Sequence, residues 1–240
     1  MRMQDGWEKG DIVMKRLFLL VILVTLVCSP MAAQQTFGLK LGAYSTEIDI
    51  GSSALDTDRA NTFGLFYEWR NPHLVVRASA DFDQEADASF TAGATSKFSR
   101  DRFEVLVGYP GTTFMDLEGG IRIDSFDATS FTIPGGSTGR VGMDRQALVL
   151  GLHFHSQRDQ RLAWYGIVRG YLGTMDISGV KDQDTSGYLV ETGLPILFGN
   201  GWAVTPGVEL ERLSTDQIAG DNTSLDFTTD RIFVSVSYTY

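Results

Sequence analysis

The sequence predicts an all-β protein: an antiparallel up-and-down transmembrane β-barrel of about ten strands, or eight if one hairpin is misread. Three observations support this prediction. Apolar and polar residues alternate over many short stretches, short turns and long polar connections follow these stretches in turn, and the tryptophans of the barrel region lie next to the short turns. Because the side chains of a strand point alternately to its two faces, each stretch has one apolar and one polar face.

The alternation is clearest in RIFVSVSYTY (231–240), where every second residue from Ile232 to Tyr240 is aliphatic or aromatic. In a soluble sandwich such an apolar face contacts a second sheet, whereas in a membrane barrel it contacts lipid and the polar face lines the inside. The stretches predicted as strands are 36–43, 62–70, 74–83, 101–109, 115–124, 147–155, 162–172, 187–194, 204–211 and 231–240.

The lengths of the connections favour the membrane barrel. Short turns are predicted at 71–73, 110–113, 157–161 and 198–201. Long polar loops are predicted near 45–61, 84–98, 126–143, 174–186 and 213–226. Short turns at one end and long loops at the other are typical of transmembrane barrels, whose loops face the outside.

Aromatic residues supply a second test. Six of them are predicted to form a girdle at the short-turn end, where amphipathic rings sit at the depth of the lipid headgroups. These residues are Trp69, Tyr109, Trp164, Trp202, Tyr238 and Tyr240.

Residues 1–33 are predicted to be a signal peptide, and residues 34–240 a single barrel domain. Two basic residues precede the apolar run 17–27, which small residues follow. This run is about half the roughly 20 residues that a helical span needs. Residues 1–13 fit neither part, and we interpret them as the product of a start assigned too far upstream, with an extended signal as the alternative.

The composition excludes several classes of site. Cys28 is the only cysteine and lies in the predicted signal, so the exported chain has no disulfide and no thiolate zinc site. The formal net charge of −10 argues against nucleic acid as a partner, since phosphate binding needs a basic face. No cofactor is predicted. After the signal no apolar run is long enough for a helical span, so a membrane protein of this sequence must be a closed barrel.

In plan, the exported chain resembles the small outer-membrane β-barrel proteins of Gram-negative bacteria, without resembling one particular family. Its last strand is similar to the terminal β-signal of that class, with Tyr240, Tyr238 and Val236 at the alternating positions. The resemblance implies an outer-membrane location, contact with outer-membrane lipid and lipopolysaccharide, and recognition of the last strand by the barrel-assembly machinery. The oligomeric state stays open.

The polar faces of the predicted strands carry many charges of both signs. In a narrow barrel, facing charges lie within pairing distance, which favours a salt-bridged, largely filled interior over a charged channel lining. The predicted lumen charges are Lys40, Glu68, Arg70, Arg77, Asp81, Arg102, Glu104, Asp116, Glu118, Arg122, Arg169, Glu191, Glu209, Glu211 and Arg231.

Two groups of residues suggest chemistry. His153, His155 and Ser156 raise the possibility of a hydrolase, but they fall near the short-turn end and Ser156 points away from His155 in a strand. Asp182, Asp184 and Ser186 are spaced like half of a calcium loop, yet Gly193 stands where the closing glutamate belongs. No metal site and no catalytic residue are therefore predicted.

The sequence thus predicts a non-enzymatic outer-membrane barrel with a charged, largely filled interior and acidic extracellular loops for surface interaction. A narrow porin-like channel for small solutes is the first alternative, and an outer-membrane hydrolase that uses His153 or His155 is the second.

Overall fold

The computed structural model describes residues 33–51, 53–90, 95–132, 138–156, 163–177, 180–215 and 224–240. These residues form thirteen antiparallel strands in one sheet. The strands are β1 (Gln34–Ile50), β2 (Ser53–Thr57), β3 (Ala60–Arg70), β4 (Val75–Asp83), β5 (Ala86–Phe90), β6 (Thr95–Thr112), β7 (Met115–Thr132), β8 (Thr138–His155), β9 (Tyr165–Ile177), β10 (Val180–Gly193), β11 (Ile196–Gly199), β12 (Trp202–Thr215) and β13 (Leu225–Thr239). In this part of the chain no helix has the length and apolarity to cross a membrane.

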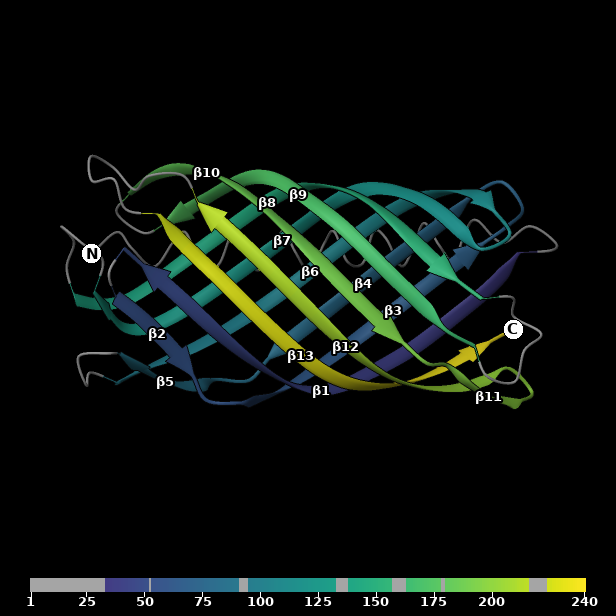
Figure 1. Ribbon diagram of the computed structural model, residues 1–240, viewed down its shortest axis with the longest axis horizontal. Coiled ribbons are helices and arrows are strands. Elements are labelled where there is room, and N and C mark those ends of the chain that lie inside the picture. Colours follow the sequence, from purple (N-terminus) through teal and green to yellow (C-terminus); the bar gives the residue numbers. More distant parts are fainter. Residues whose placement is uncertain are drawn as a thin grey trace, which may run out of the picture.

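Ten strands close into a ring (Figure 1). The ring runs β1, β3, β4, β6, β7, β8, β9, β10, β12 and β13, and β13 pairs back with β1 from Thr36↔Thr239 to Ile50↔Leu225. Each of the ten predicted stretches falls on one strand of this ring. The prediction of a ten-stranded antiparallel barrel is confirmed.

The other three strands continue strands of the ring after a short break. β2 leads into β3 through Asp58 and Arg59, β4 into β5 through Gln84 and Glu85, and β10 into β11 through residues 194–195. Beyond the breaks, β2 pairs with β1 and β5, and β5 pairs with β6. The wall therefore keeps ten strands along its length.

The prediction of long polar loops is wrong for most of their residues. β1 has 17 residues, and β6, β7 and β8 have 18 each, so these strands run through most of the stretches assigned to loops. Alternation persists there, but the two faces exchange character: polar residues point outward and apolar residues point inward. The outward polar residues made these stretches look like loops.

The outward face shows where the exchange occurs. On β8 and β9, Leu148, Leu150 and Leu172 are 67%, 72% and 68% exposed. Within a few residues along the same faces, Asp144 and Asp176 are exposed instead, directly opposite each other in the ladder. Leucine is favoured against lipid and aspartate against water, so the bilayer surface lies between these levels.

The inward face changes at the same level. We call the outward band of exposed apolar residues, such as Leu148, Leu150 and Leu172, the apolar belt. Beyond this belt the lumen is filled by a cluster of sixteen buried apolar residues, which include Tyr44, Phe98, Phe126 and Phe227. The rings of Phe126 and Phe227 approach to 5.4 Å between centroids across the lumen. This end of the barrel follows the rule for soluble proteins, with apolar residues inside and polar residues outside.

The opposite end carries the short turns and both described chain ends (Figure 1). The amide of Gln35 donates to the carbonyl of Tyr240 at 3.1 Å, and the amide of Tyr240 donates to the carbonyl of Gln35 at 3.0 Å. Three successive residues with positive φ, Gly199, Asn200 and Gly201, make the tight turn from β11 to β12. The predicted turn at 157–161 lies outside the described residues, as do residues 1–32 of the predicted signal.

Candidate functional site: the barrel interior

From the apolar cluster toward the short-turn end, the interior contains first a layer of ion pairs and then a cavity. The ion pairs join nine basic side chains, Lys40, Arg70, Arg77, Arg100, Arg102, Arg122, Arg145, Arg169 and Arg231. Their partners are ten carboxylates, Glu68, Asp81, Asp83, Glu104, Asp116, Glu118, Asp124, Glu191, Glu209 and Glu211. Nine charges against ten leave the interior nearly neutral.

The group nearest the apolar cluster is centred on Asp124 of β7. This carboxylate accepts from Arg100 at 2.7 Å, from Arg122 at 2.9 Å and from Arg145 at 3.0 Å. Across the lumen, Glu211 of β12 accepts from Arg122 at 2.6 Å. Asp124 and these three arginines are almost fully buried. Charges withdrawn from water need this degree of pairing to be tolerated.

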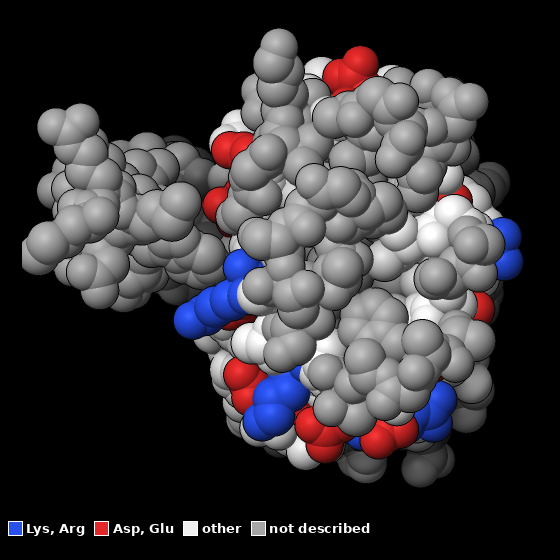
Figure 2. All heavy atoms as spheres, turned by 90° about the vertical axis from the view of Figure 1, so that its left-hand side faces the viewer, with Lys and Arg blue, Asp and Glu red and all other residues white. Residues whose placement is uncertain are grey.

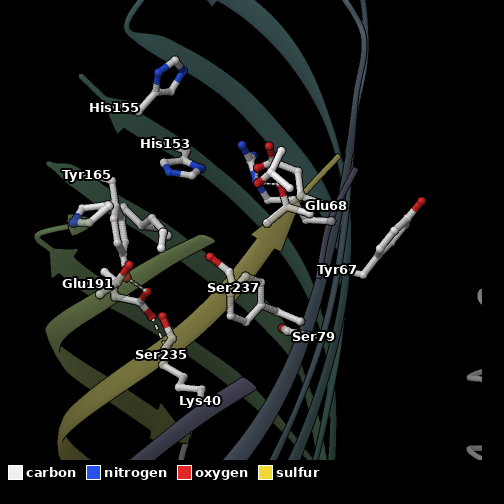
Figure 3. A pocket seen from close by; sticks show the side chains of 18 of the residues that line it. Lys40, Tyr67, Glu68, Ser79, His153, His155, Tyr165, Glu191, Ser235 and Ser237 are labelled. Carbon is white, nitrogen blue, oxygen red and sulfur yellow. Dashed lines mark hydrogen bonds and ion pairs between the residues drawn. The ribbon is translucent and has the colours of Figure 1, made fainter. Parts of the chain in front are cut away.

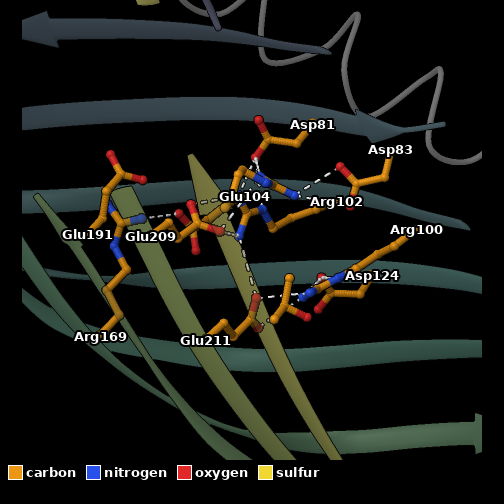
Figure 4. Close-up of polar contacts among 12 residues, drawn as sticks. Asp81, Asp83, Arg100, Arg102, Glu104, Asp124, Arg169, Glu191, Glu209 and Glu211 are labelled. Atoms are coloured by element: carbon orange, nitrogen blue, oxygen red, sulfur yellow. Dashed lines mark hydrogen bonds and ion pairs between the residues drawn. The ribbon is translucent and has the colours of Figure 1, made fainter. Parts of the chain in front are cut away.

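The second group crosses the lumen from β4 and β6 to β12 and β13 (Figure 4). Arg102 donates to Glu209 at 2.8 Å, and Arg231 donates to Asp83 at 3.0 Å. Lys40 donates to Glu191 at 2.9 Å and contacts Glu209 at 3.4 Å. The group therefore ties strands together that are far apart around the ring.

The third group lies toward the short-turn end. Arg77 donates to Glu68 at 2.9 Å and to Glu118 at 2.6 Å. Arg169 donates to Glu118 and to Glu104, each at 2.6 Å. Arg70 and Arg77 also share Asp116.

All fifteen lumen charges named from the sequence point inward in the structure and take part in this network. Four members were missed as network residues: Asp83, Arg100, Asp124 and Arg145. Arg100 and Arg145 were missed because the strands were predicted to begin at 101 and 147, whereas β6 begins at Thr95 and β8 at Thr138. The sequence did contain a signal for Arg100: positions 100, 102 and 104 are every second residue, so Arg100 lies on the same strand face as Arg102 and Glu104.

The cavity has a volume of about 520 Å³ and extends to the short-turn end of the barrel (Figure 3). Its lining reaches Gln34 and Thr239 at the strand ends and stops at Arg102 and Glu209 of the ion-pair layer. The ion pairs around Asp124 and the whole apolar cluster therefore lie between the cavity and the opposite end of the barrel.

Both histidines of the sequence-derived hydrolase alternative line this cavity (Figure 3). Their rings lie 5.8 Å apart between centroids, and Nε2 of His155 lies 3.5 Å from Asp116. The hydroxyl of Ser156 accepts a hydrogen bond from the amide of Trp164 at 3.0 Å. Ser156 is thus engaged with the chain backbone.

The six girdle residues lie at the short-turn end, as far as the described strands show. Tyr109 is 63% exposed and Trp164 is 49% exposed. The rings of Trp202 and Tyr238 contact each other at 5.1 Å between centroids, whereas Trp69 is only partly exposed. Exposed rings at one level are what a headgroup contact requires.

The calcium candidate does not have loop geometry. Asp184 and Ser186 lie on β10 and are exposed on its outward face, and the side chain of Asp182 lies outside the described set. Among the residues that the structure describes, no group of three histidine, cysteine or carboxylate side chains has the arrangement of a metal site.

The excess negative charge of the chain lies on the outside, beyond the apolar belt. Thirteen described acidic residues occur there against four basic ones, Arg59, Lys97, Arg140 and Arg212. The acidic residues are Glu47, Asp49, Asp56, Asp58, Glu85, Asp87, Asp101, Asp127, Asp144, Asp176, Asp184, Asp226 and Asp230. We call these seventeen residues the acidic collar, and Figure 2 shows charged side chains around this end of the barrel.

Replacing Asp124 with asparagine removes the charge that three buried arginines share. We expect the free energy of unfolding to fall by about 3–5 kcal/mol, because Arg145 then stays buried without an ion pair and Arg100 and Arg122 keep only Glu211. Urea unfolding in phospholipid vesicles measures this. In the control, Glu85→Gln removes the exposed partner of Lys97, and the change should stay below about 1 kcal/mol. Equal effects of the two substitutions would contradict the structural role of the network.

No family model matches the chain, and no curated protein matches it. Solved structures do. The outer membrane protease OmpT from Escherichia coli superimposes with a TM-score of 0.58 at 11% identity, over 88% of this chain and 98% of that one. The translocator domain of the autotransporter NalP from Neisseria meningitidis gives a TM-score of 0.50 at 12% identity, over 97% of both chains.

At these identities the similarity shows a shared fold. It does not assign the activity of either protein to this chain. The fold is that of Gram-negative outer-membrane barrels. The chain adds its own belt of exposed leucine and aromatic side chains, which water disfavours and a bilayer accommodates. The protein therefore has the fold of an outer-membrane β-barrel and an outer apolar belt suited to a bilayer.

Proposed function

We propose that the protein is a non-enzymatic surface protein of the outer membrane, with a closed lumen and an acidic collar that binds cationic partners outside the cell. The observation that carries the proposal is the order of the interior layers. Sixteen buried apolar residues and nineteen paired charges occupy the lumen in succession, from the outer end inward.

Ion passage through such a lumen is unfavourable at both layers. In the apolar cluster an ion loses its hydration without gaining a polar partner. In the ion-pair layer it has to displace arginine or carboxylate groups that are already bonded to each other. These arguments favour the closed barrel over the porin-like channel.

The acidic collar supports the second half of the proposal. Thirteen carboxylates against four basic groups produce a negative field on a rigid wall that stands outside the apolar belt. Cross-strand neighbours such as Asp144 and Asp176 have the same charge, and like charges opposite each other destabilise a sheet. A cationic partner relieves this repulsion.

A non-enzymatic role is proposed because, among the described residues, neither Nδ1 of His153 nor Nε2 of His155 has a hydrogen-bond partner. The hydrolase alternative needs a hydroxyl or water held against His153 or His155. The nearest serine in sequence, Ser156, is bonded to the backbone of Trp164.

Conductance across a planar lipid bilayer tests the closed lumen. Refolded residues 34–240 should give no steps above the detergent control, once insertion is verified by protection of the strands from protease. Stable stepwise currents from the inserted protein would refute the closed lumen and favour the channel.

Binding of a fluorescent oligolysine to the protein in nanodiscs tests the collar. We expect saturable binding that weakens steeply with salt, because the charges are exposed and screened. Replacing Asp144, Asp176, Asp226 and Asp230 with asparagine should weaken binding at least tenfold. In the matched control, asparagine replaces Ser99, Thr174, Ser186 and Ser214 and should leave binding unchanged. Equal binding by both variants would reject the collar as the binding surface.

A further inference from the structure

The cavity at the short-turn end has features that neither the closed lumen nor the collar explains. Its volume of about 520 Å³ falls within the range of about 300–1,000 Å³ that is usual for small-molecule sites. Barrels place their short turns in the periplasm, so the cavity opens to that compartment. A barrel that served only as an anchor would be expected to fill this space with side chains.

Aromatic rings are kept against the wall of the cavity by glycines. Tyr165 of β9 lies over Gly193 of β10, where an added Cβ would be 2.5 Å from Cε1 of the ring. Phe66 of β3 lies over Gly38 of β1 in the same way. An aromatic ring that covers a cross-strand glycine packs flat on the sheet. The two rings therefore leave the centre open and present apolar faces to it.

The charges that line the cavity are balanced and occupied. Five are basic, Lys40, Arg70, Arg77, Arg102 and Arg169, and five are acidic, Glu68, Asp81, Glu104, Glu191 and Glu209. Each of these ten groups has an ion-pair partner. A charged ligand would have to break one of these pairs or remain uncompensated in a confined space, and both cost free energy.

Uncharged polar groups are available to a ligand. The Nδ1 atom of His153 is buried and has no hydrogen-bond partner within the described part of the chain. The ring of His153 lies 5.7 Å from that of Tyr165 between centroids. Ser79, Ser235 and Ser237 add hydroxyl groups to the lining (Figure 3). A buried polar atom without a partner costs free energy that a ligand can recover.

From these four observations we propose that the cavity is a periplasm-facing binding site for a small, uncharged, amphipathic molecule. The flat apolar face of this molecule packs on the aromatic walls, and its hydroxyl or similar group bonds to His153 or to a serine hydroxyl. The inference goes beyond the proposed function and does not depend on the collar.

The chain contains three histidines, which make the test specific. His153 and His155 line the cavity, whereas His73 lies exposed in the turn between β3 and β4. Histidine-labelled protein in nanodiscs is titrated with benzyl alcohol, benzoate and benzylammonium, and the ring signals are followed by NMR. With benzyl alcohol we expect saturable shifts of His153 and His155 and no shift of His73. Benzoate and benzylammonium should bind at least tenfold more weakly.

A variant pair locates the site. Ser237→Trp fills the cavity and should weaken benzyl alcohol binding at least tenfold, whereas Ser214→Trp, on the outward face of β12, should leave binding unchanged. If Ser237→Trp does not fold, Ser79→Leu fills the cavity from β4 instead. Equal shifts of all three histidines, equal affinity for a charged analogue, or full binding by the filled variant would each overturn the proposal.

Discussion

The closed ladder of backbone hydrogen bonds is the constraint from which the rest of this structure follows. A bilayer offers no water to an unpaired amide, so the first and last strands must meet, and β1 and β13 pair along their whole length. Once the ring is closed, each strand has one face toward lipid and one toward a narrow lumen. Charged side chains placed on the inner face then lie within bonding distance of one another, which is why nine basic and ten acidic groups pair with each other inside the lumen.

The same wall serves in two solvents, and the side chains record where the change occurs. Along β13 the outward residues are Val236, Val234 and Ile232 in the belt, and then Asp230 and Asp226 above it. The inward residues change in the opposite sense, from Arg231 to Phe227. In lipid, apolar residues are favoured outside and charges can be kept inside. In water, the hydrophobic effect makes an apolar interior favourable. Ten strands continue through both solvents, so the sheet beyond the apolar belt is as regularly paired as the sheet within it.

The sequence was sufficient for the ring and its faces, because alternation identifies a strand whatever its partners are. All ten strands were predicted, and so were fifteen of the nineteen inward charges. The strand segments beyond the apolar belt were missed because their outward residues, such as Glu47 and Asp49, are polar like those of a loop. The alternating inward residues Ile48 and Ile50 were the sign of a strand. That error also hid Arg100 and Arg145. The cavity was beyond prediction, since it depends on which inward groups pair across the lumen and on rings such as Tyr165 lying flat over glycine.

Solvent accessibility along β13 tests this account most directly. The only cysteine, Cys28, lies in the predicted signal, so single-cysteine variants of the exported chain can each carry one nitroxide label. Labels at Ile232, Val234 and Val236 should be accessible to oxygen in the lipid, and labels at Asp226, Thr228 and Asp230 to a water-soluble nickel complex. Labels at the inward positions Phe227, Thr229 and Arg231 should be shielded from both reagents. Lipid accessibility at Asp226 and Thr228, or nickel accessibility at Phe227 and Arg231, would contradict the change of solvent along the wall and the filled interior behind it.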